Sequence, residues 1–283
     1  MAIKRYTASV DTTITNAFMR DLNTRATGAN MGAADVLEVY SIYGQASTGS
    51  VELSRVLIKF PTAQISDDRT AGDVPASGSV NFYLRMFNAR HGLTTPRNFT
   101  LEVLPISTDW EEGVGLDMDE YTDFTNDNIG ANWMSASTSA KWPVPGGDFY
   151  TASWGNTVAF TKGTEDVDLD ITELVEEWMN SNELSNYGAL IKLIGTQEGF
   201  FDDTTSDGTI PNYNNGPILH NVTGATTSYY TKKFFGRTSE FFYKRPHIEA
   251  RWNSSVADDR GRFYYSSSLA EEDDNPNTVY MYN

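Results

Sequence analysis

The sequence predicts an all-β protein: a jelly-roll-like β-sandwich with one short amphipathic helix at about 170–180 and long loop insertions. Three observations support this fold class. Tyrosine and phenylalanine, 15 of each among 283 residues, favour strands over helices. Short segments alternate apolar and polar side chains between turn-forming residues. Complete helix signals occur in a single stretch.

The predicted helix lies within 165–194, whose sequence is EDVDLDITELVEEWMNSNELSNYGALIKLI. Asp170 and Glu173 are spaced as in a capping box. Apolar residues then recur on one helical face, at Ile171, Leu174, Val175, Trp178 and Met179. We expect strand, helix, turn and strand here, with Trp178 filling the interior at an end or a face of the sandwich.

Strands account for most of the remaining patterns. They are expected at 6–18, 36–43, 51–60, 80–88, 99–106, 189–194, 228–236, 240–244 and 246–252. Pro61 ends the third of these, and a polar loop is expected at 67–79. We expect one sandwich domain over 1–252, with insertions at about 107–157 and 199–224, followed by an extended C-terminal arm at 253–283.

The composition excludes several classes of function. A net charge of −17 opposes binding to nucleic acid and to anionic membranes, and no apolar run approaches the length of a membrane span. Because cysteine is absent, the chain holds no disulfide, thiolate zinc site or thiol nucleophile. The first 15 residues lack the apolar core of a secretory signal, so we expect synthesis in the cytoplasm.

Catalytic signals are weak, and we expect a protein that is not an enzyme and needs no cofactor. The three histidines, His91, His220 and His247, stand in no Ser-His-acid pattern, and no glycine-rich phosphate loop is present. Adjacent acids such as Glu111 and Glu112 favour a solvated surface. A glycan hydrolase that uses acids of the 107–123 loop is the remaining enzymatic alternative, since such enzymes need two facing carboxyl groups.

Two acidic segments are candidates for a structural calcium site. Asp203 and Asp207 supply oxygen ligands at alternate positions before Gly208, as in the first half of a calcium loop, although Asn214 stands where that loop needs glutamate. Asp117, Asp119 and Asp123 form the second candidate. The alternative is that both segments are solvated acidic loops.

Two further features indicate binding surfaces. Trp133, Trp142 and Trp154 lie in the first insertion, where they would form either a sugar-stacking platform or the insertion's own small core. Near the end, a strand pattern follows the acidic spacer 271–274. Its residues are Val279, Tyr280, Met281 and Tyr282. This segment either folds back or pairs with the sheet of a neighbouring subunit, and we favour the second, as an assembly arm.

The order of several short motifs resembles the DNRLRE family of β-sandwich domains, which is related to a carbohydrate-binding module family. Each motif is short, but together they span 11–250. The motifs are Asp11-Thr12-Thr13-Ile14, Asn30-Met31-Gly32, Leu37-Glu38-Val39, Ser54-Arg55-Val56-Leu57-Ile58-Lys59-Phe60, Thr108-Asp109-Trp110-Glu111-Glu112-Gly113, Asp170-Ile171-Thr172 with Trp178, Asn186-Tyr187-Gly188, Ser239-Glu240 and Arg245-Pro246-His247-Ile248-Glu249.

This resemblance implies a jelly-roll-like sandwich of the kind found on exported surfaces. Two departures stand out: this chain shows no signal peptide, and its insertions at 115–160 and 199–224 are long. Its start and tail look like those of virion structural proteins of tailed bacteriophages.

We therefore expect a virion component of the head, neck or tail surface, made in the host cytoplasm and released by lysis. Its partners would be other virion proteins and copies of itself. The alternative is a carbohydrate-binding module that recognises a host surface glycan.

Overall fold

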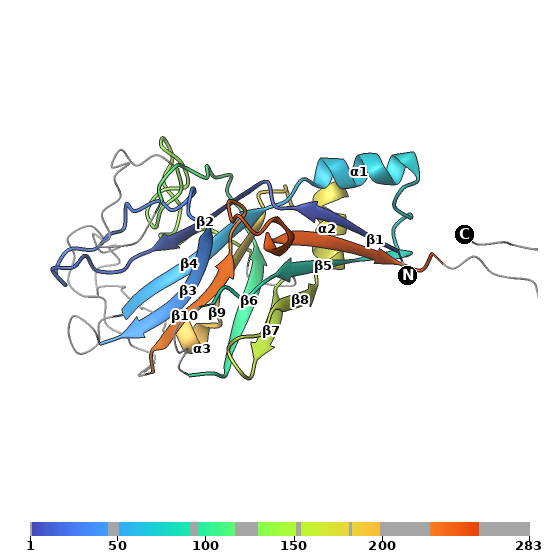
Figure 1. Cartoon of the computed structure of the whole chain (residues 1–283). Helices are drawn as coiled ribbons and strands as arrows, with labels where there is room; N and C mark the ends of the chain where they lie inside the picture. Colours follow the sequence, from blue (N-terminus) through green and yellow to red (C-terminus); the bar gives the residue numbers. More distant parts are fainter. Residues whose placement is uncertain are drawn as a thin grey trace, which may run out of the picture.

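The structure, a computed structural model, describes residues 2–44, 51–90, 96–116, 130–150, 154–180, 183–198 and 227–254. Its strands form two antiparallel sheets, one of which curls into a half-barrel (Figure 1). The predicted all-β sandwich is confirmed. The predicted helix is present as α2 (Thr172–Asn180), and Trp178 is fully buried in the core.

The smaller sheet has four strands in the order β1 (Ala2–Thr7), β11 (His247–Trp252), β5 (Val80–Met86) and β8 (Val167–Asp170). Its first two strands come from opposite ends of the described chain. Ala2 pairs with Trp252 and Thr7 with His247. This pairing fixes the start of the chain against the last described strand.

The larger sheet has seven strands. Its order is β10 (Tyr229–Phe235), β3 (Val36–Tyr43), β4 (Val51–Lys59), β9 (Ala189–Leu193), β6 (Phe99–Pro105) and β7 (Asn156–Phe160), with β2 (Val10–Thr15) paired to β4. Strand β4 is its centre, because it pairs with three strands: β3 along 51–54, β2 along 54–59 and β9 along 56–58.

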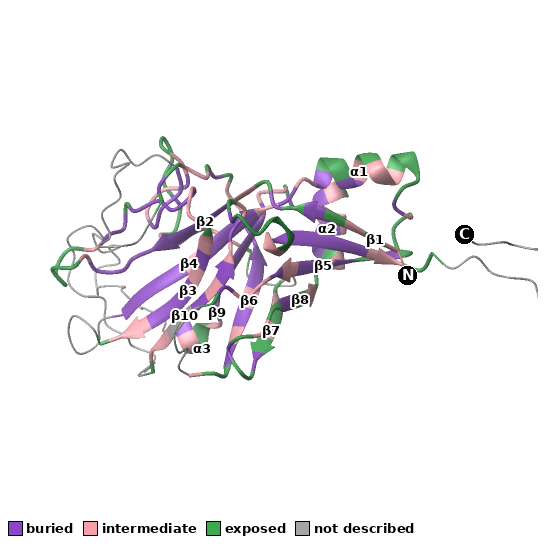
Figure 2. Ribbon diagram, viewed as in Figure 1, coloured by how far each residue is buried: buried purple, intermediate pink, exposed green. Residues whose placement is uncertain are grey.

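The main core lies between the two sheets, and the strands of both are largely buried (Figure 2). Strands of both sheets contribute alternate side chains to it, such as Val56 and Ile58 of β4 and Phe82 and Leu84 of β5. Helix α2 adds three buried side chains, those of Leu174, Val175 and Trp178. The amphipathic pattern of this helix is thus satisfied by packing against the sandwich.

A second core lies on the opposite face of the larger sheet. Leu57 and Leu190 point there, away from their neighbours in the main core, and meet Trp110, Trp133 and Trp142. The tryptophans belong to the segments 107–116 and 130–150. Strands β4 and β9 are therefore covered on both faces, which explains their nearly continuous burial.

Helix α1 (Thr62–Ala71) was not predicted: no element was expected at 62–66, and the polar loop expected at 67–79 is wrong for 67–71. It buries only Thr62 and Ile65. Two sets of polar contacts hold it: Asp68 bonds to Lys4 and Tyr6, and Arg69 pairs with Glu176 of α2 at 2.6 Å. Gly72 ends the helix in the left-handed conformation.

The strand expected at 240–244 is wrong. This segment is a turn that contains the 3₁₀ helix η2 (Phe242–Lys244). Arg245 Nε donates to the carbonyl of Ser239 at 2.9 Å, and Lys244 N–H donates to the carbonyl of Phe241 at 2.8 Å. These bonds close the chain on itself, so the segment makes no ladder with a neighbouring strand.

Candidate functional site

Three consecutive aromatic side chains project from the turn between β10 and β11. Phe241, Phe242 and Tyr243 are 40%, 75% and 55% exposed, and the turn lies on the surface (Figure 2). We call these three residues the aromatic ledge. Exposed aromatic residues are enriched at the centres of protein interfaces, where they bury large areas with little loss of conformational entropy.

The rings of the ledge pack on each other and on the turn below. Phe241 meets Phe235 edge-to-face at 5.5 Å, and Tyr243 meets Phe242 edge-to-face at 5.7 Å. The Lys244 amine lies 4.8 Å from the Phe235 ring centre and 5.5 Å from that of Phe241. A partner would therefore meet a preformed surface and order few side chains on binding.

A buried acid and an ion pair anchor the chain just before the ledge. Arg237 donates two bonds to Glu112 Oε1 and one to Oε2, while its N–H donates to Asp11 Oδ2 at 2.6 Å. Asp11 N–H in turn donates to Glu112 at 2.8 Å. Burial raises the pKa of Asp11 to about 7. This node joins β2, the first insertion and the ledge turn.

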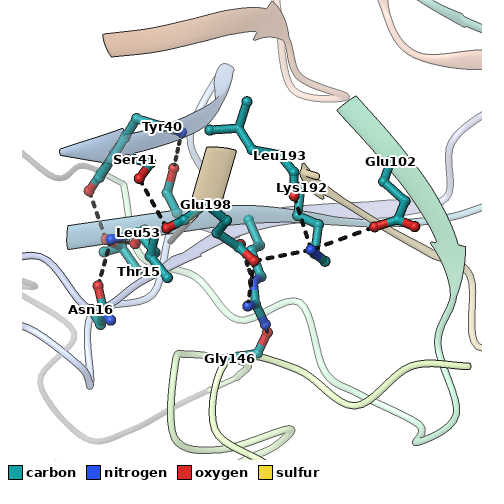
Figure 3. A network of polar contacts seen from close by, with 12 residues as sticks. Thr15, Asn16, Tyr40, Ser41, Leu53, Glu102, Gly146, Lys192, Leu193 and Glu198 are labelled. Atoms are coloured by element: carbon teal, nitrogen blue, oxygen red, sulfur yellow. Dashed lines mark hydrogen bonds and ion pairs between the residues drawn. The ribbon is translucent and has the colours of Figure 1, made fainter. Parts of the chain in front are cut away.

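A buried charge cluster lies on the outer face of the larger sheet (Figure 3). Glu198, the last residue of α3 (Gly195–Glu198), accepts bonds from Arg55 at 2.7 and 3.0 Å and from Lys192 at 3.1 Å. Arg55 also donates to the carbonyl of Gly146 at 2.6 Å. Burial acts to raise the pKa of Glu198, but the two cations hold this pKa below its usual value. The cluster fastens α3 and the first insertion to the sheet.

Two hollows of the described surface are large enough to be considered as binding sites. One, of about 400 Å³, is rich in hydroxyl groups and is lined by Thr27, Gly28, Asn132, Met134, Ser135, Thr138, Ser139, Ala140 and Lys141. The other, of about 520 Å³, lies on the smaller sheet beside Tyr83 and Arg251. The guanidinium of Arg251 stacks 4.0 Å above the Tyr83 ring and pairs with Glu249 and Asp168, so its charge is already balanced.

The three loop tryptophans lie within the protein. Trp133 and Trp142 are each 4% exposed and form part of the second core, and Trp154 is partly buried against the main core. Arg55 stacks 5.0 Å from the Trp133 ring, and Trp142 Nε1 donates to the carbonyl of Asn132. Neither Trp133 nor Trp142 presents an open ring face to solvent, and both contribute packing to the insertion.

Other predicted residues lie outside the described part of the chain. These are the arm residues Val279, Tyr280, Met281 and Tyr282, the calcium candidates Asp117, Asp119, Asp123, Asp203 and Asp207, and two histidines, His91 and His220. Within the described ranges, no group of three acids or histidines is placed to hold a metal ion. No helix among these residues has the length and apolar character needed to cross a bilayer.

The remaining predicted histidine, His247, is buried in β11, and burial lowers its pKa. The acids Glu111 and Glu112 both hold structural bonds. Glu111 accepts from Thr138, and Glu112 from Arg237. The ledge was missed because Phe241-Phe242-Tyr243 was assigned to a strand. The three consecutive aromatic residues were a signal against a half-buried strand, since such a strand buries only alternate side chains and would expose at least one of the three rings.

A scan against protein-family models finds no family that matches the chain, and a search of curated proteins finds no similar sequence. The resemblance to the DNRLRE family therefore stays a prediction based on the motifs described above.

Proposed function

We propose that this chain is a non-enzymatic structural protein of a bacteriophage virion and acts through protein–protein assembly. The observation that carries the proposal is the aromatic ledge: three exposed rings on a turn that its own hydrogen bonds close. Such a surface suits a protein partner, because burying each ring gains apolar free energy without a large ordering cost. The resemblance of the start and tail to those of virion structural proteins, together with the resemblance of the motif order to DNRLRE sandwich domains, supports the class.

The contact partners in this proposal are other virion proteins and copies of the same chain. The ledge provides one contact. The strand pattern at 278–282, outside the described residues, provides a second through pairing with a neighbour's sheet. Deleting 266–283 should leave the monomer folded, as judged by circular dichroism, and lower the amount of chain in particles.

The test begins with purified particles from the phage that encodes the chain, analysed by quantitative mass spectrometry. The chain should be present in fixed copy number. Phe242→Ser should lower this copy number, because it removes the most exposed ring of the ledge. Val144→Ser is the matched control, since Val144 is 59% exposed on a different segment, and it should leave incorporation unchanged.

Absence of the chain from particles would refute the virion assignment. Wild-type copy number for Phe242→Ser would leave that assignment standing but remove the ledge as a contact. Both outcomes are distinguished from misfolding by the circular dichroism spectrum and the thermal midpoint of each purified variant.

The second candidate, recognition of a surface glycan, is favoured by one observation. The hydroxyl-rich hollow beside Thr27 and Ser135 offers several polar groups in a concave site, as sugar binding requires. A glycan array separates the two proposals. Binding of a defined saccharide that Ser135→Leu abolishes would favour the glycan function, and an array without hits would count against it.

A further inference from the structure

Lys232 of β10 is buried inside the protein although it carries an amine. Its Nζ lies 2.6 Å from the side-chain oxygen of Asn88, 2.8 Å from the carbonyl oxygen of Glu165 and 3.3 Å from that of Gly163. The amide carbon of Asn88 is one C=O bond of about 1.23 Å beyond its oxygen, so the amine and this carbon are under about 4 Å apart.

The backbone around Asn88 is fixed on both sides. Asn88 forms an isolated bridge with Phe234 of β10, and its N–H donates to Asp166 Oδ1 at 2.8 Å. Ala89 N–H donates to the carbonyl of Lys233 at 3.0 Å. The Asn88 amide is therefore held against the lysine by the fold, and such fixed proximity greatly increases the rate of a reaction between two groups.

We propose that Lys232 and Asn88 form an intramolecular isopeptide bond. The neutral Nζ of Lys232 attacks the side-chain carbonyl carbon of Asn88 and forms a C–N bond. The bond between that carbon and Nδ2 then breaks, and Nδ2 leaves as ammonia with a proton that comes from the attacking amine. The reaction needs no oxidant, reductant or further reactant. Its products, one secondary amide and one ammonia, together contain all the atoms of the two starting groups.

The surroundings of Lys232 suit this reaction. The ring centres of Phe160 and Phe234 lie 5.0 and 4.9 Å from its Nζ, and Lys232 is 2% exposed. Burial lowers the pKa of Lys232 to about 8, so a substantial fraction of the amine is neutral near physiological pH. An enclosed site also disfavours hydrolysis of the amide.

Glu165 supplies negative charge near the reacting amine. Its backbone carbonyl accepts from Lys232, and its Oε2 is enclosed without a hydrogen-bond partner among the described residues. Burial acts to raise the pKa of Glu165, but N–H groups of Lys162 and Thr161 hold it at about 2. Glu165 and Asp166 both act electrostatically on Lys232, so their charges stabilise the positive charge that its nitrogen gains when it attacks the carbonyl carbon.

The bond would connect the two sheets. Lys232 belongs to an edge strand of the larger sheet, and Asn88 follows β5 of the smaller one (Figure 1). The two residues are 144 positions apart in the chain. A covalent link over such a span restricts the unfolded chain, as a disulfide does. This chain has no cysteine, so a lysine–asparagine link would supply a covalent connection by other chemistry.

The test is the intact mass of the full chain, measured under denaturing conditions. The mass should be lower than the sequence mass by one ammonia, and tandem mass spectrometry of proteolytic fragments should identify a branched peptide that joins Asn88 to Lys232. Lys232→Met and Asn88→Ala should both restore the full mass. Lys233→Met is the matched control, because Lys233 is its neighbour but pairs with Glu38. The Lys233→Met variant should still have a mass lower than its sequence mass by one ammonia.

Lys232→Arg provides a second variant that retains the positive charge if Lys232→Met fails to fold, and it should also show the full mass. Glu165→Gln should slow the loss of ammonia in freshly purified protein. A wild-type chain at its full sequence mass would overturn the proposal. So would an ammonia loss that persists in the Lys232 variants, because an asparagine would then have cyclised on its own backbone.

Discussion

At the residue scale, the buried charges show how much the fold depends on complete sets of partners. Glu198 pairs with both Arg55 and Lys192 on the outer face of the larger sheet. Removing one member of such a set leaves the others buried without compensation, which costs more than the intact cluster contributes. The cluster therefore specifies how α3 docks against the sheet.

We predict that Glu198→Gln lowers the free energy of unfolding by about 3–5 kcal/mol, because two cations lose their counter-charge. Glu102→Gln is the matched control. Its carboxylate lies 3.6 Å from Lys192 and is 27% exposed, so its loss should cost at most about 1 kcal/mol. Urea denaturation measures both. Equal effects of the two substitutions would contradict the central role of Glu198.

Asp11 leads to a second residue-scale prediction, on pH. Burial raises the pKa of Asp11 from 3.8 to about 7, so the folded state retains a proton that the unfolded state has lost. Its stabilising contribution is complete below about pH 4 and disappears as the pH rises to about 7. Asp11→Asn should therefore be more stable than wild type at pH 8, and the difference should shrink at pH 4. Thermal midpoints at both pH values test this.

At the element scale, one glycine controls the entry into β9. Gly188 has φ +87°, and a Cβ there would lie 2.2 Å from the carbonyl oxygen of Ile58. Ile58 pairs with Ala189, the first residue of β9, and Ile106 N–H donates to the carbonyl of Gly188 at 2.9 Å. Close approach of three segments at this point requires a residue without a side chain.

Gly188→Ala should therefore destabilise the protein by several kcal/mol. Gly72→Ala is the control, since Gly72 has φ +84° but a Cβ added there would meet no atom within 4 Å, and it should cost only about 1–2 kcal/mol for the left-handed backbone. Chemical denaturation of both variants separates the clash from the backbone strain. If Gly188→Ala lowers the free energy of unfolding no more than Gly72→Ala does, then β4 and β9 can move apart at little cost.

At the scale of the whole molecule, the sequence predicted the sandwich but not the surface that we propose as its contact. Strands such as β3 and β5 were identified because one face of each packs on a common core. Helix α1 was missed because ion pairs between distant residues, such as Arg69 with Glu176, hold it. The ledge was missed because the bond from Arg245 to Ser239, which folds its turn, leaves no periodic pattern.

The net charge of −17 gives a prediction on association. Copies of the chain repel one another at low ionic strength, and salt screens this repulsion over a distance of about 10 Å at 0.1 M. Self-association through the ledge should therefore strengthen as salt increases. Sedimentation velocity of wild type and of Phe242→Ser, each at low and high sodium chloride, tests this. Association that weakens with salt would indicate that ion pairs hold the contact.

The contacts of Glu198 and Ser228, which lie on either side of 199–226, have a practical consequence for engineering. The Ser41 hydroxyl donates to the carbonyl of Glu198, and two residues along β3 the N–H of Tyr43 donates to the hydroxyl of Ser228. The chain thus departs and returns beside the same strand. A foreign peptide could replace the intervening sequence with its two junctions already held close together, which makes this position suited to displaying an epitope or an affinity tag.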